Sequence, residues 1–482
     1  MTIKNIMWFR NDLRLSDNPA LDYAAKNGEV MAIYIFDEKV DIDKKLGAAS
    51  KWWLHHSLES LNKDLNGKLN IYQGDAAKII KKLHDNYNFK GIYWNRRYEP
   101  LLKNQDTAIK KYFHELNVEV KSFNAALLFE PHEVLKDDKT PYKVFTHYYR
   151  KGCLQNSKTP RHPIHQPKNL DLIRDNKFST DIKSLELIDK IPWHQTMEKT
   201  WKIGEKHAQD KLHNFIKNDI NNYKIGRDFP SLKKVSQLSP HLHFGEISPH
   251  QIWHYTIMHY QDKANEKNLD SFLSEIGWRE FSYYLLYHFS ELAYKNFQPR
   301  FDNFPWHHNQ KYFLAWQKGL TGYPIVDAGM RELWHTGYMH NRVRMIVGSF
   351  LVKNLLIDWR YGEKWFWDCL VDADLASNSA SWQWVAGSGA DAAPYFRVFN
   401  PVLQGEKFDP EGEYTKKYLP QLAKLPAQYL FNPSAAPKEI LKAAQIELGK
   451  DYPFAIVDID SSRNKALEAF KKLKITNADK LH

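Results

Sequence analysis

One stretch of the sequence, LVDADLASNSASWQW, places several chemically versatile side chains within a few residues of each other. Asp372 and Asp374 form an Asp-x-Asp pair, which can hold a metal ion and, through the metal, a phosphate or a nucleotide sugar. Asn378 adds an amide, and Trp382 and Trp384 add two indoles, which no metal site requires. The first question is therefore whether the carboxylates bind a metal or support a large organic ligand.

The neighbours of the Asp-x-Asp pair argue against a metal. Such a pair usually lies in a loop among polar groups that complete an oxygen shell, but here the flanking residues are Leu370, Val371, Ala373 and Leu375. A buried carboxylate needs a cationic or hydrogen-bonding partner, and an arginine or a ligand N–H would serve as well as a metal. The histidines of HLHFG and PWHHN also lack the i, i+4 spacing of a helical two-histidine site. We therefore expect no bound metal.

Two further segments, HNRVRM and EIGWREF, place polar groups three and four residues apart, so that each set shares one face of a helix. The first face carries Asn341, Arg344 and Met345, and the second carries Glu275, Trp278, Arg279 and Ser282. Two such faces suit the walls of a pocket for a large polar aromatic ligand. Ordinary ion pairs between two helices would explain the same spacing equally well.

The elements that must position these groups fall into an α/β region, a connector and a helical region. Short β-rich runs (NIMWFR, EVMAIYIF, LNIYQG, GIYWN and VEVKSF) alternate with helix-length segments, which predicts a doubly wound parallel α/β domain over 1–130. Residues 131–200 lose this periodicity and gain proline, as expected of a connector on the surface. Nearly every segment of 201–482 has helical periodicity, which predicts a second, all-α domain. No glycine-rich turn follows the first strand, so we do not expect ordinary dinucleotide binding there.

The composition favours a basic cytoplasmic protein. The 68 Lys and Arg against 57 Asp and Glu give a net charge of +11, which suits a nucleic-acid partner, although a lysine-rich surface that only maintains solubility gives the same total. Two cysteines build no disulfide framework, and the N-terminus MTIKNIMWFRND does not resemble a signal peptide. No apolar stretch is long enough to span a membrane.

The 16 tryptophans gather toward the C-terminal half, where base stacking or a flat aromatic cofactor would use them.

Seven runs along the chain share their order and residues with one known family: FRNDLRLSDNPAL, LSPHLHFGEISP, WREF, TGYPIVDAGMREL, GYMHNRVRMIVGSFLVKNLLIDWRYGEKWF, DLASNSASWQWVAGSGADAAPYFRVFNP and QGEKFDPEGEY. They resemble the photolyase/cryptochrome family, and within it the microbial members that repair cyclobutane pyrimidine dimers. The resemblance implies an antenna domain, a helical domain that holds FAD in a U shape, and a carbon–carbon lyase activity. In that reaction blue light excites reduced flavin, an electron passes to the dimer, the ring opens and the electron returns.

The resemblance also implies which residues line the flavin pocket. Asp372 would pair with Arg344 beside the isoalloxazine ring, and Asn378 would face its N5. The full set would be Tyr223, Ser236, Leu238, Ser239, Phe272, Glu275, Arg279, Asn341, Arg344, Asp372, Asp374 and Asn378. Glu275 would also hydrogen-bond the dimer and stabilise its radical anion, for which we expect burial to raise its pKa.

The same comparison implies a surface for damaged DNA, from which the dimer flips out of the duplex toward the flavin. Trp278 and Trp384 would form an aromatic wedge, with Met345 and Asn341 completing the pocket, and the phosphates would be held by Arg227, Arg342 and Arg397. Three further indoles, Trp382, Trp359 and Trp306, match the family's electron path from flavin to surface, although each could instead be an ordinary core residue. We expect a monomer with no membrane contact.

Some positions depart from the family pattern. Val235 stands where a threonine hydroxyl is common, and Phe272 stands where a tryptophan is common. Leu101 and Leu102 replace a pair that some members use to hold a folate antenna, so a second chromophore of folate or pterin, deazaflavin or flavin type is left open. Trp52 and Trp53 could stack such a planar group.

Three rival functions are kept open beside dimer repair, one of which is a nucleotide-sugar or metal enzyme that uses Asp372 and Asp374. A cryptochrome, which senses blue light without repair, is disfavoured by Asn378 and by the dimer-pocket residues. A (6-4) photolyase is disfavoured because Asn341 stands where that class places a catalytic histidine.

Overall fold

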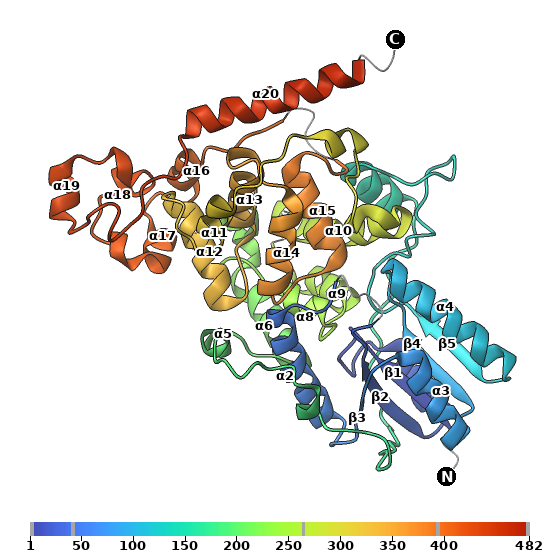
Figure 1. The fold of residues 1–482 in the computed structure, drawn as a ribbon. Coiled ribbons are helices and arrows are strands. Elements are labelled where there is room, and N and C mark those ends of the chain that lie inside the picture. Colours follow the sequence, from blue (N-terminus) through green and yellow to red (C-terminus); the bar gives the residue numbers. More distant parts are fainter. Residues whose placement is uncertain (1–3, 40–43, 263–265, 392–395, 479–482) are drawn as a thin grey trace. The chain divides into compact units, whose positions relative to one another are not determined.

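The computed structural model describes residues 4–39, 44–262, 266–391 and 396–478 (Figure 1). The chain divides into two compact units. The first contains Met1–Asn221, Ser236–Ser290 and Val371–Ala376, and the second contains Asn222–Val235, Glu291–Leu370 and Ser377–His482. Parts of the helical region, residues 236–290 and 371–376, belong to the same unit as the N-terminal sheet.

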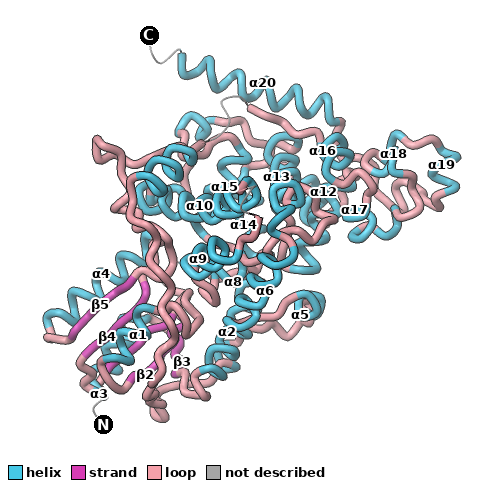
Figure 2. The backbone as a smooth tube through the Cα atoms, turned by 180° about the vertical axis from the view of Figure 1, so that it is seen from behind, coloured by secondary structure: helices cyan, strands magenta, loops and turns pink. Residues whose placement is uncertain are grey.

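The first unit contains a five-stranded parallel sheet with the order β3-β2-β1-β4-β5 (Figure 2). Its strands are β1 (Asn5–Phe9), β2 (Val30–Phe36), β3 (Asn70–Gln73), β4 (Gly91–Asn95) and β5 (Glu119–Phe123). The helices between them are α1 (Pro19–Lys26), α2 (Ala48–Asp64), α3 (Ala76–Tyr87) and α4 (Pro100–Glu115). The predicted doubly wound α/β fold is therefore confirmed, and each of the five predicted strands is present.

The central strands are buried along their whole length, which explains their nearly continuous apolar sequences. One face of the sheet, with Ile6, Trp8 and Ile33, packs against apolar side chains of α3 and α4. The helix α1 packs against β4, β1 and β5 on the opposite face, as Figure 2 shows. Both faces are thus closed, and only the ends of the strands remain for a ligand.

The segment 131–200 is not simply a surface connector, because its aromatic residues belong to the core of the first unit. Phe145, Tyr148 and Tyr149 are buried, and the last two lie in the π-helix η1 (His147–Gln155), which contacts α10 (Lys267–His288). A Cβ at Gly277 of α10 would lie 2.6 Å from the Tyr149 ring, so glycine is required for this close approach.

The rest of the chain is almost entirely helical, as predicted. The first unit adds α5 (Gln195–Thr200), α6 (Glu205–Asn218), α8 (Ser239–His243) and α9 (Pro249–His259). The second unit holds α7 (Tyr223–Gly226), α11 (Gln310–Gln317), α12 (Pro324–Thr336), α13 (Asn341–Ser349), α14 (Trp359–Cys369), α16 (Pro401–Phe408), α17 (Glu413–Tyr418), α18 (Ala427–Leu430), α19 (Lys438–Ala443) and α20 (Ile459–Ala478). The helix α15 (Leu375–Ala386) begins in the first unit and continues in the second.

The long helical run from Val326 to Ile357 is divided at Gly337. This residue has φ = 65°, a left-handed conformation that ends α12 and favours glycine. The helix α13 then starts at Asn341 with the side chain of His340 as its cap, and it continues into the π-helix η6 (Phe350–Asn354). Within the described residues, no helix is both long enough and apolar enough to cross a membrane.

Candidate functional site

The two carboxylates of the Asp-x-Asp pair are buried and held by hydroxyl groups of the first unit. Ser239 Oγ donates to Asp372 Oδ2 at 2.6 Å, and the Tyr283 hydroxyl donates to Asp374. Both aspartates are less than a tenth exposed and lie directly before α15. Hydroxyl donors satisfy a carboxylate without a metal, so this arrangement suits a ligand that supplies further N–H groups.

The Asn378 amide is oriented by the second unit. Its Nδ2 donates to the backbone oxygen of Glu363 at 3.1 Å, and a carbonyl oxygen can only accept, so the amide cannot be flipped. Its neighbour Ser379 donates from Oγ to the Glu363 carboxylate at 3.2 Å. Asn378 Oδ1 is therefore a fixed acceptor in the first turn of α15, four residues after Asp374.

The helix α10 presents the predicted indole and guanidinium, and both have partners in the first unit. The Trp278 ring stacks on Phe145 at 3.8 Å between centroids. Arg279 Nη1 donates to the backbone oxygen of Ala126 at 2.7 Å, and its guanidinium lies 4.9 Å from the centre of the Tyr283 ring. Glu275 and Phe272 lie on the same helix. The stacking partner of Trp278 comes from 131–200, where the sequence pattern gave no hint of a core.

Glu280 is a buried carboxyl of α10 that the sequence interpretation missed. Its Oε2 accepts from the backbone N–H groups of Leu128 and Phe129 at 2.8 and 3.2 Å. Burial raises its pKa to about 8, despite the lowering effect of Arg279 and of the two N–H groups. The available signal was a glutamate on the apolar side of the helix in WREF, one residue after Arg279.

The helix α13 presents its predicted polar residues in different environments. Asn341 is exposed, while Arg344 is half-buried and donates from Nε to the backbone oxygen of Met339 at 2.7 Å. Arg342 forms an ion pair with Asp228 and lies 4.3 Å from the centre of the Phe408 ring. A DNA phosphate at Arg342 would therefore compete with a carboxylate.

The three indoles predicted for electron transfer differ in burial. Trp359 is fully buried, and its Nε1 donates to Asn296 Oδ1 at 2.9 Å. Trp382 is buried, whereas Trp306 is half-buried beside Phe304. A fourth indole, Trp316, lies 6.3 Å from Trp382 between ring centres, and the sequence interpretation did not single it out.

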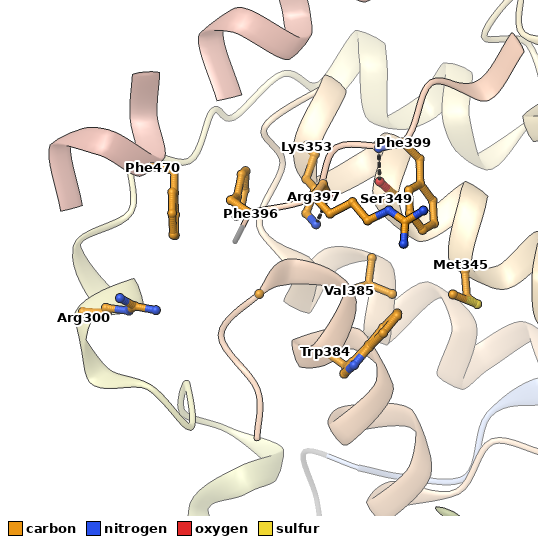
Figure 3. A pocket seen from close by; sticks show the side chains of 11 residues that line it. Arg300, Met345, Ser349, Lys353, Trp384, Val385, Phe396, Arg397, Phe399 and Phe470 are labelled. Atoms are coloured by element: carbon orange, nitrogen blue, oxygen red, sulfur yellow. Dashed lines mark hydrogen bonds between the residues drawn. The ribbon is translucent and has the colours of Figure 1, made fainter. Parts of the chain in front are cut away.

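Three of the predicted DNA residues line one pocket of the second unit (Figure 3). They are Trp384, Met345 and Arg397. The pocket also contains aromatic and cationic side chains: Phe396, Phe399, Phe470, Arg300 and Lys353. No carboxylate is among the described lining residues, so the pocket favours an anionic ligand with an aromatic part.

The remaining predicted positions are placed as follows. Leu238 is buried, and its N–H donates to Ser236 Oγ at 3.4 Å. Tyr223 is buried, with the Arg227 guanidinium 5.7 Å from the centre of its ring. Val235 and Arg227 are half-buried.

The suggestion that Trp52 and Trp53 stack a planar chromophore is wrong. Both rings are almost fully buried in the first unit, and Trp53 is packed against His241 and Phe244 while its Nε1 donates to Glu246. The space that a chromophore would need is filled by side chains.

One group among the described residues meets a simple geometric criterion for a metal. His55, His56 and Glu59 on α2 bring three potential ligand atoms within 4.8 Å of one another. Each histidine lies within 3.3 Å of the Glu59 carboxylate, so direct pairing accounts for the cluster. The histidines of HLHFG also lie near carboxylates, since His241 pairs with Glu246 and His243 Nδ1 lies 3.8 Å from Asp374 Oδ2.

The chemistry of the donor set fits a flavin. Reduced and oxidised isoalloxazine rings both present N–H donors and acceptors. The first unit orients carboxylate oxygens at Asp372 and Asp374, and the second unit orients the amide oxygen of Asn378. The hydroxyl groups of Ser236 and Ser239 and the guanidinium of Arg279 are of the types that bind a diphosphate. The predicted set is shared by both units, with Tyr223, Asn341, Arg344 and Asn378 in the second and the others in the first.

Comparison with known proteins agrees with these features. Residues 5–168 match the family model described as DNA photolyase, and residues 272–472 match the FAD binding domain of DNA photolyase. A deoxyribodipyrimidine photo-lyase from Agrobacterium fabrum is 47% identical over 98% of both chains. Cryptochrome-1 from Arabidopsis thaliana is 35% identical over 97% of this chain and 70% of its own length.

Among solved structures, a bacterial class III photolyase from Agrobacterium tumefaciens superimposes with a TM-score of 0.93 at 46% identity, covering 98% of each chain. The chain therefore belongs to the photolyase/cryptochrome family, and its helical part contains the FAD-binding domain of that family.

Proposed function

We propose that this protein is a deoxyribodipyrimidine photolyase, which uses blue light to split cyclobutane pyrimidine dimers in DNA. The observation that carries the proposal is the pocket that brings Trp384, Met345 and Arg397 together, with no carboxylate among its described lining residues. An indole and a thioether suit an extruded pair of bases, and a guanidinium suits the neighbouring phosphate. Likeness to the Agrobacterium photolyases along the whole chain supports the same function.

The cofactor is FAD, which in its reduced state supplies the excited electron that opens the dimer. The residues that would hold it are Tyr223, Ser236, Leu238, Ser239, Phe272, Glu275, Arg279, Asn341, Arg344, Asp372, Asp374 and Asn378. Asn378 Oδ1 would accept the N5–H of the ring, because Glu363 holds the amide in that orientation. Asp372, supported by Ser239, would pair with Arg344 and hold the ring against rotation.

In the DNA complex, Glu275 would hydrogen-bond the dimer and stabilise the charge that it acquires. Trp278 and Trp384 would enclose the extruded bases, with Asn341 and Met345 beside them. The phosphates would be bound by Arg227, Arg342 and Arg397. Such contacts depend on charge and not on base sequence. Trp382, Trp359 and Trp306 would return the flavin to its reduced state by electron transfer from the surface.

The domain boundaries, the oligomeric state and the location in the cell are part of the same proposal. We expect an antenna domain over 1–130 that takes a second chromophore, a connector over 131–200 whose aromatic residues pack in the first unit, and the catalytic domain over 201–482. We propose that the protein acts as a monomer in the cytoplasm.

The alternative is a cryptochrome-type photoreceptor, favoured by the 35% identity with Cryptochrome-1. Two dark measurements on the purified protein separate the candidates. An absorption spectrum should show bound flavin, and fluorescence anisotropy should show tighter binding to an oligonucleotide with one thymine dimer than to the undamaged one. Bound flavin with no preference for the dimer would favour the photoreceptor.

A further inference from the structure

A short extended segment, residues 396–399, forms one wall of the pocket in Figure 3 and is attached to the neighbouring helix at two points. The N–H of Phe399 donates to Ser349 Oγ at 3.4 Å. The ammonium group of Lys353 donates to the backbone oxygen of Arg397. Ser349 ends α13 and Lys353 lies four residues later in η6, so the two attachments are about one helical turn apart.

The side chain of Lys353 is unusual because it is charged and almost completely buried. Its residue is 6% exposed, and Nζ lies 4.7 Å from the centre of the Phe396 ring. The charged groups that line the pocket with it are Arg300 from η5 (Pro299–Asn303) and Arg397, and none of the described lining residues is acidic. A buried cation among other cations is costly unless an anion approaches.

The side chain of Arg397, in contrast, is exposed, and its guanidinium lies 5.1 Å from the centre of the Phe399 ring. The backbone oxygen of Arg397 accepts a hydrogen bond from Lys353. The backbone N–H of Phe399, whose ring lies beside the guanidinium, donates to Ser349. The direction of this guanidinium therefore depends on both attachments.

We propose that Lys353 is a positioning residue for DNA binding: it fixes the main chain at Arg397, so that the guanidinium meets a phosphate of the damaged strand, and its own charge strengthens the attraction. This inference rests on the proposed function in one respect: both require DNA as the ligand. Lys353 acts through Arg397 and has no part in the light reaction.

The proposal has a consequence for pH. Burial, with a smaller contribution from Arg397, lowers the pKa of Lys353 to about 7. A phosphate bound nearby favours the ammonium form and raises this pKa in the complex. Below pH 7 the side chain of Lys353 is already protonated in the free protein. Above pH 7 it must take up a proton when DNA binds. Affinity for DNA should therefore fall as pH rises above 7, with a slope of up to about tenfold per pH unit.

The test measures the anisotropy of a labelled oligonucleotide carrying one thymine dimer between pH 6 and pH 9 at constant ionic strength. The protein is used with its flavin bound, as wild type, Lys353→Met and Ser349→Ala. At pH 6 we expect Lys353→Met to bind about tenfold more weakly, the loss typical of a charge-assisted hydrogen bond. Its affinity should no longer change between pH 7 and pH 9. Ser349→Ala loses the uncharged attachment and should keep the wild-type pH dependence.

A structural role alone would give a different pattern. If Lys353→Met kept the wild-type slope above pH 7, the proposal would be overturned. A wild-type affinity that does not change between pH 7 and pH 9 would overturn it without any variant. Failure of the proposed function would appear separately, as absence of any preference for the dimer or of any repair by wild type.

Discussion

Gly362 lies directly against the indole of Trp382. A Cβ at position 362 would lie 2.2 Å from ring atom Cη2 of Trp382 and 2.6 Å from Leu351 Cδ2, far inside contact distance. The absence of a side chain on α14 therefore determines where the first indole of the proposed electron path can sit.

Replacing Gly362 with alanine should displace the Trp382 ring. We expect slower photoreduction of oxidised flavin, together with a loss of about 1–3 kcal/mol in the free energy of unfolding from overpacking. Transient absorption and chemical denaturation measure the two effects. Gly348→Ala is the matched control, since its Cβ would make only ordinary contact with Trp382, at 3.6 Å. Equal photoreduction in Gly362→Ala and wild type would contradict a role for this ring position.

Trp306 is the half-buried end of the proposed path. Trp306→Phe should slow photoreduction of oxidised flavin strongly and leave repair by chemically reduced flavin unchanged, because phenylalanine is much harder to oxidise than tryptophan. Trp316→Phe, next to Trp382, tests whether the fourth indole carries electrons as well. If photoreduction depended on Trp316 and not on Trp306, the proposed path would be wrong.

Glu275 is proposed to stabilise the charge on the dimer. Glu275→Ala should lower the repair yield while the flavin spectrum and flavin content stay the same, since loss of one hydrogen-bond donor to a developing anion typically costs a factor of ten or more in rate. Quantum yield measured with reduced enzyme at saturating substrate is the relevant readout. An unchanged yield would remove this role.

Glu280 should make stability depend on pH. Its pKa is raised by burial to about 8 in the folded protein, so between about pH 4.5 and pH 8 the folded state retains a proton that the unfolded state has released. The free energy of unfolding should then fall as pH rises through this window. Glu280→Gln keeps an acceptor for the N–H groups of Leu128 and Phe129 and should flatten the decline. Thermal unfolding at several pH values measures it, and parallel curves for variant and wild type would disprove the assignment.

Asp228 should limit the contribution of Arg342 to DNA binding, because the two side chains form an ion pair at a partly exposed position. Asp228→Asn should strengthen DNA binding a few-fold at low salt and steepen its salt dependence. Asp22→Asn, which removes the carboxylate of an exposed pair with Lys26, controls for the change in net charge. An unchanged salt dependence would mean that Arg342 does not bind phosphate.

The sequence was most informative where local pattern and burial agree. The strands β1, β2 and β4 could be predicted because their apolar runs are buried along their whole length, whereas β5 keeps exposed polar residues at its start. Phe145 could not be assigned to a core, since its partner Trp278 lies more than a hundred residues away. Lys353 has no sequence signal that separates it from an exposed lysine, and Glu280 was indicated only by its place on the apolar side of its helix; tertiary packing buries both.

The central claim is light-driven dimer repair, and one measurement tests it most directly. The purified protein with reduced flavin is mixed with an oligonucleotide that carries a single thymine dimer, and intact thymines are quantified in the dark and under blue light. Dimer repair should occur only under light, with many dimers restored per protein molecule and no net consumption of reductant. A flavin-containing protein that binds the oligonucleotide and restores no thymine under blue light would contradict the account.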